Sequence, residues 1–294
     1  MRWLVVTGLL LAWGTLACTD SARDGQGNRQ SDSARVAADT MPNAVRGRAI
    51  LAAFRDSLPE YSGNGLRCTS CHLDDGKRPT ALPWLGSAAR YPQYRARPGI
   101  EEPMTQRVNE CIARSLAGRM LPEDGTAMRD ILAYLESLRF EARPPATPTV
   151  TLAGNEGHGR QVYAASCARC HGAKGEGLVA PPVWGENSYS IGAGMARQHV
   201  FATFVHANMP HDSAGVLARQ DAADVAAFVL SQPRPDHPGK ERDWPKGDPP
   251  ADVAYATDAA RAAGKPVPPA RPVLPRRVMP RPPADSATPP SPGS

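Results

Sequence analysis

The chain has 294 residues, which is long enough for two small domains, and its formal net charge is +5. This mild positive charge favours anionic partners, but no basic helix or RNA-binding motif accompanies it, so nucleic-acid binding is excluded. The 31 prolines and 26 glycines predict much irregular structure and some disorder.

Residues 1–18 have the pattern of a secretory signal. The apolar run Trp3–Ala17 has fifteen residues, which is too few to span a bilayer. It ends at Leu16-Ala17-Cys18, which resembles a bacterial lipobox and predicts a lipidated Cys18; simple cleavage near Ala17 is the alternative. Residues 19–43 are polar without apolar periodicity and are interpreted as a tether. We therefore expect a periplasmic protein that is lipid-anchored at Cys18.

A five-residue motif occurs twice, as Cys68-Thr69-Ser70-Cys71-His72 and as Cys167-Ala168-Arg169-Cys170-His171. The pattern C-x-x-C-H attaches c-type haem, because the two thiolates add to the vinyl groups and the histidine ligates the iron. A zinc cluster would need further closely spaced Cys or His pairs, and a thioredoxin-like redox pair would need a βαβ context. Neither context is present, so we expect two covalently bound haem c groups.

Each motif opens a region with the size of one small cytochrome c domain. We predict an all-α fold with two tandem cytochrome c-type domains, 44–140 and 154–232, each wrapped around one haem. A Pro- and Thr-rich linker, 141–153, joins them. Apolar periodicity predicts helices at 44–54, 105–116, 125–138 and 221–230.

Two glycines predict how these helices pack. In cytochrome c folds the helix before the motif crosses a C-terminal helix at a small residue, so Gly47 and Leu51 should meet Ile131 and Tyr134. The same set recurs as Gly159 and Tyr163 against Val225 and Phe228. This recurrence supports an internal duplication of one fold.

The first iron has two candidate sixth ligands, Cys111 and Met120. Met120-Leu121-Pro122 faintly resembles the usual Met-Pro pattern, but Met120 follows His72 by 48 residues, whereas Cys111 follows it by 39. In the second domain the corresponding spacing is 38 residues. A lone thiol outside the cytoplasm is an oxidation hazard unless it is coordinated or otherwise used, which favours Cys111. A buried inert cysteine and a disulfide with Cys18 are the alternatives.

Met209-Pro210 has the usual Met-Pro pattern, so His171 and Met209 are expected to ligate the second iron. His206 and His211 flank Met209 and could compete for this position. We interpret both as solvent-exposed or propionate-bonded histidines.

Several stretches between about residues 45 and 250 carry a family resemblance, in order along the chain. They are Cys68–Asp74, Tyr91–Arg97, Arg107–Ser115, Pro181–Gly185, Gly192–Ala196, Asn208–Pro210 and Ser231–Pro235. Together they are similar to the dihaem thiosulfate dehydrogenases, which oxidise two thiosulfates to tetrathionate and in many members also catalyse the reverse reaction. The resemblance implies a thiosulfate dehydrogenase / tetrathionate reductase.

The resemblance also implies residue roles. It places His/Cys ligation of the active-site haem on His72 and Cys111, and substrate contacts on Arg97, Arg107 and Ser115. Thiosulfate and tetrathionate are dianions, and Arg binds such groups bidentately without losing its charge. Ser115 lies four residues after Cys111, on the same helix face. Solvated or propionate-bound arginines are the alternative, and direct bonding of Cys111 to a substrate sulfur stays open.

Beyond Gln232 the prolines cluster and apolar periodicity stops. Residues 233–261 resemble the family's extension that packs on the body of the protein. Residues 262–294, rich in Pro, Ala, Arg and Ser, are predicted to be disordered.

Thiolate ligation lowers the reduction potential of a haem iron and Met ligation raises it. We therefore expect electrons to pass from the first haem to the second, and then to a soluble cytochrome or a similar redox partner. The alternative is a non-catalytic dihaem electron carrier that docks on an oxidase or reductase. Such a carrier would need neither Cys111 nor the arginines and would use Met120.

Overall fold

The computed structural model describes residues 41–279. The predicted signal at 1–18 and nearly all of the tether at 19–43 lie outside these residues, as does the end of the tail from residue 280. From Pro42 onward the described residues belong to one compact unit. Within residues 41–279 no helix combines the length and the apolar character needed to cross a membrane.

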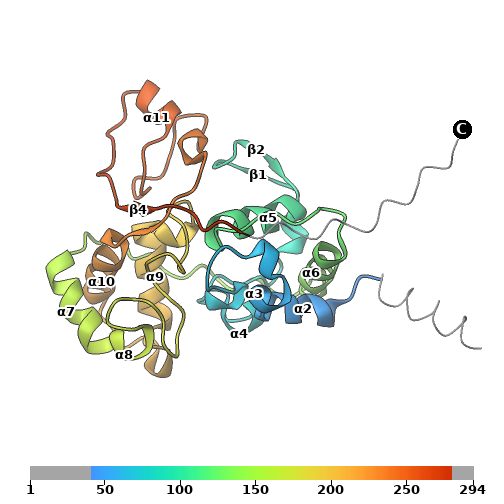
Figure 1. The fold of residues 1–294 in the computed structure, drawn as a ribbon, viewed down its shortest axis with the longest axis horizontal. Coiled ribbons are helices and arrows are strands. Elements are labelled where there is room, and N and C mark those ends of the chain that lie inside the picture. The colour runs from blue at the N-terminus through green and yellow to red at the C-terminus, as the bar shows by residue number, and fades with distance from the viewer. Residues whose placement is uncertain (1–40, 280–294) are drawn as a thin grey trace, which may run out of the picture. The chain divides into compact units, whose positions relative to one another are not determined.

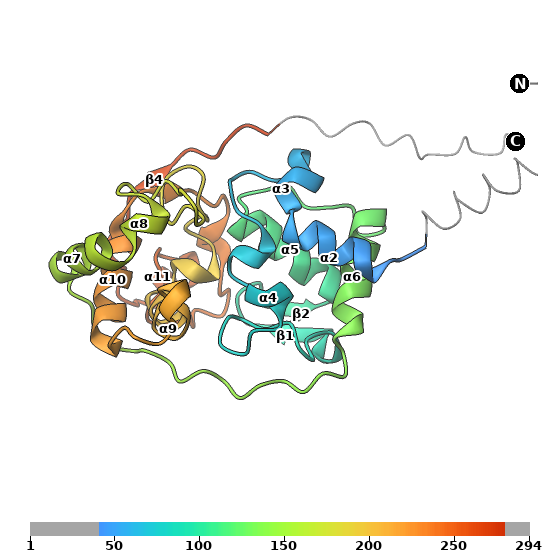
Figure 2. The same ribbon diagram turned by 90° about the horizontal axis from the view of Figure 1, so that it is seen from below.

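Helices dominate the described residues (Figures 1 and 2). The first half, residues 44–140, contains α2 (Ala44–Ala52), α3 (Phe54–Ser57), α4 (Leu73–Gly76), α5 (Met104–Ser115) and α6 (Thr126–Ser137), with the antiparallel strands β1 (Gln93–Arg95) and β2 (Ile100–Glu102). The second half, residues 154–232, contains α7 (Glu156–Ser166), α8 (Ala168–His171), α9 (Gln198–Asn208) and α10 (Arg219–Ser231). The C-terminal segment, residues 233–279, contains α11 (Asp258–Ala262) and the parallel strands β3 (Arg234–Pro235) and β4 (Val273–Leu274).

Short 3-10 helices complete the described elements, at Pro59–Tyr61, Cys68–Ser70, Ala88–Arg90, Gly194–Ala196, His211–Ser213 and Lys240–Arg242. The four predicted helices are confirmed, with bounds that differ by at most two residues. The first of them is interrupted at Ala53, where the backbone leaves the helical region and α3 begins.

The predicted helix crossings are confirmed in both halves. Helix α2 packs on α6, and α7 packs on α10 (Figure 2). A Cβ added to Gly47 would overlap the Asp130 carbonyl oxygen, and a Cβ added to Gly159 would overlap that of Asp224. Only glycine permits such close backbone approach.

The same polar contacts hold the start of the leading helix in each half. Asn43 caps α2, and its N–H donates to Asp130 Oδ1 at 2.7 Å, while the Arg46 guanidinium pairs with the same carboxylate at 2.7 Å. Asn155 caps α7 in the same way and donates to Asp224 Oδ1 at 2.7 Å. These contacts support the internal duplication.

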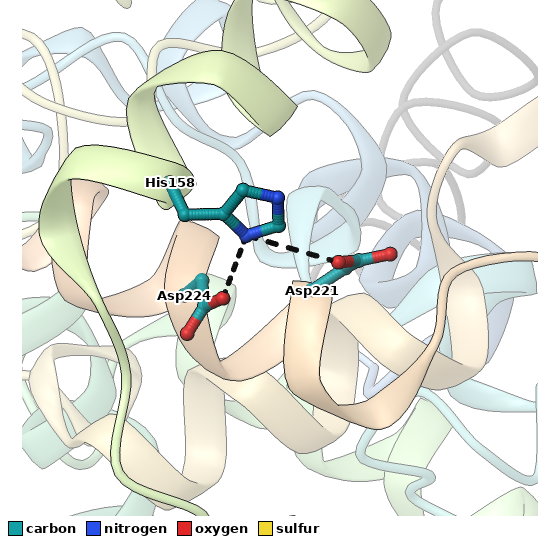
Figure 3. Close-up of side chains that lie close together, drawn as sticks. All are labelled: His158, Asp221 and Asp224. Atoms are coloured by element: carbon teal, nitrogen blue, oxygen red, sulfur yellow. Dashed lines mark hydrogen bonds and ion pairs between the residues drawn. The ribbon is translucent and has the colours of Figure 1, made fainter.

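In the second half the place of the arginine is taken by His158 (Figure 3). Its Nδ1 lies 2.8 Å from Asp224 and 3.9 Å from Asp221. Burial opposes ionisation of Asp224, but hydrogen bonds from the Asn155 N–H, His158 and Gln220 outweigh it and lower the pKa of this carboxyl. The three side chains of Figure 3 therefore form a helix clamp, equivalent to the ion pair of the first half.

The two halves share one continuous apolar core. Buried polar contacts join them as well: the Asn64 amide donates to the carbonyls of Ser115, at 2.8 Å, and Ser188, at 2.9 Å. Ser190 Oγ donates to the Arg114 carbonyl at 2.7 Å. Between α6 and α7 every residue is described and none belongs to a helix or strand, but Val150 is fully buried and its N–H donates to Thr203 Oγ1 at 2.9 Å.

The C-terminal segment differs from the disorder that the sequence predicts from residue 262. Within residues 262–279 the segment makes defined contacts: β4 pairs with β3, and the Asp236 N–H donates to the Leu274 carbonyl at 2.9 Å. Arg276 donates to the Gly118 carbonyl at 2.9 Å. These are backbone and side-chain hydrogen bonds to distant residues, which apolar periodicity does not reveal.

Candidate active site

In the first motif, one ring nitrogen of His72 already has a hydrogen-bond partner. His72 Nδ1 lies 2.5 Å from the Leu82 carbonyl oxygen. A carbonyl only accepts, so Nδ1 carries the proton and Nε2 keeps its lone pair for a metal. Burial lowers the pKa of His72 to about 4, which keeps the ring neutral at neutral pH. Cys68 and Cys71 beside it are free thiols.

The second motif repeats this arrangement. His171 Nδ1 lies 2.7 Å from the Pro181 carbonyl oxygen, and burial lowers the pKa of the ring. Cys167 and Cys170 are free thiols here too. The second histidine therefore also presents an unprotonated Nε2.

A cavity of about 510 Å³ opens beside the second motif. It is lined by the motif residues, by apolar side chains of α9 and α10, and by Met209, which directly follows α9. Two thiols, an imidazole and a thioether around an apolar cavity are the donor set of a covalently bound haem c, so the residues fit that group. Thr69, Ser70 and Cys71 of the first motif also line this cavity, so the two motif sites adjoin.

A tryptophan packs against a glycine next to each motif. A Cβ at Gly76 would overlap the Trp84 ring, and a Cβ at Gly175 would overlap the Trp184 ring. Trp84 also stacks on His72 with ring centroids 4.7 Å apart. Trp184 is buried, and Trp84 is half-buried.

Cys111 lies on α5, close to the first motif. Burial is the main reason that the pKa of Cys71 is raised to about 12 and that the pKa of Cys68 is raised as well. The electrostatic effect of the nearby Cys111 is the second cause in both cases. Cys111 is itself a free thiol, while Cys18 lies outside the described residues. The competing candidate, Met120, has 51% of its surface exposed. The structure therefore brings Cys111, and not Met120, to the cysteines that would attach the first haem.

Arg107 and Ser115 lie one turn before and one turn after Cys111 on α5. The electrostatic effect of the nearby Cys111 sulfur raises the pKa of Arg107, against an opposing effect of burial. The Arg107 guanidinium and the Ser115 hydroxyl make no hydrogen bond to any other residue in 41–279, and Arg107 makes no ion pair there. The two side chains are therefore available to a ligand beside the Cys111 thiol.

Arg97 is held more firmly than Arg107. Its Nη1 donates to the Gly192 carbonyl at 2.8 Å, and its guanidinium lies over the Trp244 ring, 4.8 Å from the ring centre. The Trp244 backbone N–H donates to the Arg97 carbonyl at 2.8 Å. Burial lowers the pKa of Arg97, and none of the described carboxylates forms an ion pair with it. Its positive charge is thus fixed in place without being neutralised.

The sequence interpretation missed a buried polar network that joins α5 to the C-terminal segment. Arg114 donates to Glu110 at 2.6 Å and to both oxygens of Asp243 at 2.8 and 2.7 Å. The Tyr255 hydroxyl donates to Asp243 Oδ2 at 2.5 Å. The Glu110–Arg114 pair has the four-residue spacing of a helix ion pair, but Asp243 carries no local signal.

The histidines beside Met209 have other partners. His206 Nδ1 lies 2.9 Å from the Leu217 carbonyl, and His211 Nε2 lies 3.5 Å from Arg78. His211 also lines the cavity of the second motif.

Asn208 links the two motif sites. It is fully buried, and it accepts a hydrogen bond from Thr80 Oγ1 at 2.8 Å. Its amide donates to the carbonyls of Thr80 and Phe204, both at 3.0 Å. Thr80 lies two residues before Leu82, the partner of His72, and Asn208 directly precedes Met209.

Comparisons with known proteins show the family to which the chain is similar. The model of the family "Cytochrome C oxidase, cbb3-type, subunit III" matches residues 154–229. A thiosulfate dehydrogenase of Psychrobacter arcticus is 35% identical over 255 residues, covering 81% of this chain and 78% of that protein. A thiosulfate dehydrogenase of Allochromatium vinosum is 40% identical over 210 residues, covering 65% of this chain and 78% of that protein.

One solved structure is similar in fold. It is the thiosulfate dehydrogenase TsdBA of Marichromatium purpuratum in its "as isolated" form, with 29% identity and a TM-score of 0.64 over 68% of this chain. The match covers 49% of that chain, so the present chain spans about half its length. This likeness and the match to a cytochrome family confirm the predicted all-α cytochrome c fold.

Proposed function

Because the chain belongs to the thiosulfate dehydrogenase family, we propose that it joins two thiosulfate ions into tetrathionate. The two dianions lose one electron each and one sulfur–sulfur bond forms between them, so the reaction releases two electrons and no proton. A one-electron acceptor such as a soluble cytochrome takes up these electrons one at a time. With electrons supplied instead, the same site would split tetrathionate into two thiosulfates.

The observation that carries this proposal is the unpartnered polar surface beside Cys111. Arg107 offers a cationic fork and Ser115 a hydroxyl, one turn to either side of the thiol, and neither is engaged by another described residue. Arg97 adds a second cation without an ion-pair partner among the described residues. Two dianions repel each other, and such cations offset that repulsion while they bind the sulfonate oxygens.

The residues of both motifs support two haem c groups. His72 and Cys111 would ligate the first iron, and His171 and Met209 the second. When bound, each haem would take up one electron and pass it on, from the first to the second and then to the acceptor. The first motif lines the cavity of the second, so only a short path separates the two sites.

The alternative function, a non-catalytic electron carrier, has less support. It predicts Met120 as the ligand of the first iron, and this side chain is half-exposed in the segment between α5 and α6. It also gives no role to the unpartnered Arg107 and Ser115.

The deciding experiment is an assay of the purified protein carrying its haems. We expect thiosulfate-dependent reduction of an artificial one-electron acceptor, with two electrons per tetrathionate formed. A parallel assay follows tetrathionate-dependent oxidation of a reduced dye. A protein that holds its haems but neither oxidises thiosulfate nor reduces tetrathionate would be a carrier.

We also propose that the protein is periplasmic and anchored by a lipid on Cys18, on the basis of the sequence alone. Cys18→Ser should release the protein from the membrane fraction. Equal membrane association of the wild-type protein and the Cys18→Ser variant would contradict the anchor.

A further inference from the structure

The C-terminal segment contacts helix α5 and Arg97 next to the candidate site. Its residues Asp243 and Trp244 are each only 4% exposed. The two neighbours contact different parts of the first half: Asp243 meets helix α5, and Trp244 meets Arg97.

Asp243 holds α5 through Arg114, three residues after Cys111 and one before Ser115. The carboxylate accepts two parallel hydrogen bonds from the Arg114 guanidinium, and Tyr255 donates a third. Bidentate Arg–carboxylate pairs fix both distance and orientation. The rotation of α5 about its axis, and with it the direction of Cys111, is thereby set from outside the first half.

Trp244 holds Arg97 at both ends. Its backbone N–H donates to the Arg97 carbonyl, and its ring lies under the guanidinium. The Arg97 guanidinium also donates to the Gly192 carbonyl of the second half, which fixes its orientation over the ring. No flexible arginine side chain would keep one position without such supports.

We propose that Asp243 and Trp244 are positioning residues of the active site: Asp243 orients the Cys111 helix through Arg114, and Trp244 aims the Arg97 cation. This inference rests on the proposed function for its substrate, but its account of Cys111 concerns the iron ligand itself. It assigns the C-terminal segment a role in assembling the site as well as in stabilising the fold.

The first test is Asp243→Asn in the full-length protein with its haems. It keeps the shape but loses the charge that pairs with Arg114. We expect kcat/KM for thiosulfate to fall by roughly 10- to 100-fold, because a small misplacement of reacting groups has effects of this size. The electron paramagnetic resonance signal of the thiolate-ligated ferric haem should broaden or shift.

The matched control is Asp130→Asn. Asp130 is a buried carboxylate with a bidentate arginine partner, Arg46, and it lies on α6 away from the site. Its loss should lower the thermal midpoint about as much as Asp243→Asn does, while kcat/KM stays within about twofold of wild type. Equal losses of activity in both variants, or an unchanged haem signal in Asp243→Asn, would overturn the positioning role of Asp243.

The second test compares Trp244→Leu with Trp244→Phe. Leucine removes the aromatic face under the Arg97 guanidinium, and phenylalanine keeps it. We expect Trp244→Leu to raise KM about tenfold with a smaller change in kcat, and Trp244→Phe to stay within about threefold of wild type. Equal KM values for the two variants would overturn the role of Trp244.

The two proposals can fail separately. If the wild-type protein has no thiosulfate activity, the proposed function is wrong, and the haem signal of Asp243→Asn still decides whether the C-terminal segment orients Cys111. If the wild type is active and neither variant shows its expected change, only the positioning role is wrong.

Discussion

The two halves of the chain hold a Cys-x-x-Cys-His motif on the same framework but present different helices to it. In both, a glycine of the leading helix meets a carbonyl of the closing helix, and a backbone carbonyl fixes the motif histidine. The difference lies in α5 and α9. Helix α9 presents apolar side chains, Phe201 and Phe204, and ends at Met209.

Helix α5 instead presents Arg107, Cys111 and Ser115 at four-residue intervals. The framework that would hold the iron is therefore separate from the helix that decides what else can approach it. An apolar helix with a thioether suits electron transfer, and a polar helix with a thiol admits an anion. The four predictions below test this division.

The largest effect is expected from Cys111→Gly. Removing the thiol should lower thiosulfate turnover by at least about 1000-fold, because the group at the reacting centre is lost. Both haems should remain attached, since attachment depends on the motif cysteines, and a pyridine haemochrome measurement would show two per chain. An active variant would contradict the role of Cys111.

The second prediction concerns the reduction potentials of the two sites. The His72/Cys111 haem should lie on the order of 100 mV below the His171/Met209 haem, since axial ligands tune haem iron over several hundred millivolts. Spectroelectrochemical titration would resolve the two steps. Equal or reversed potentials would rule out the proposed direction of electron flow.

The third prediction separates charge from geometry at Arg107. Lysine keeps the charge but loses the bidentate fork, so Arg107→Lys should lower kcat/KM about tenfold. The control is Arg139→Lys, two residues beyond the end of α6, where the arginine pairs with Glu136 at the surface. A normal kcat/KM in Arg107→Lys would show that charge alone suffices.

The smallest effect is expected at the helix clamp of the second half. Because the pKa of Asp224 is lowered in the folded protein, its ionised form stabilises the fold above about pH 4, and this contribution is lost as pH falls through the folded pKa. Asp224→Asn should therefore lower the free energy of unfolding by about 1–2 kcal/mol at pH 7. The difference from wild type should shrink in acid, as chemical denaturation at both pH values would show. A difference that does not change with pH would contradict the assignment.

The sequence predicted the parts of the molecule that depend on local pattern. Helical periodicity gave the four helices, and the paired glycines gave both helix crossings, because a missing Cβ has a direct steric meaning. The spacing argument favoured Cys111 over Met120 as the partner of the first motif, and Cys111 lies close to Cys71 in the structure.

Contacts between polar residues far apart in the chain could not be predicted. Asp243 pairs with Arg114 across 129 positions, and the sequence around neither residue indicates this contact. The placement of residues 262–279 depends on similar distant hydrogen bonds, such as that of Arg276 to the Gly118 carbonyl, within a composition that is typical of disorder.

The Asn208 side chain has a consequence for ligand exchange at the proposed second haem. To withdraw Met209, the chain must move its neighbour Asn208, whose side chain makes three hydrogen bonds, two of them to Thr80. At about 1 kcal/mol each, these bonds oppose the replacement of sulfur by another donor when the oxidation state changes. Absorption spectra of the oxidised and reduced protein should accordingly show methionine on this iron in both states.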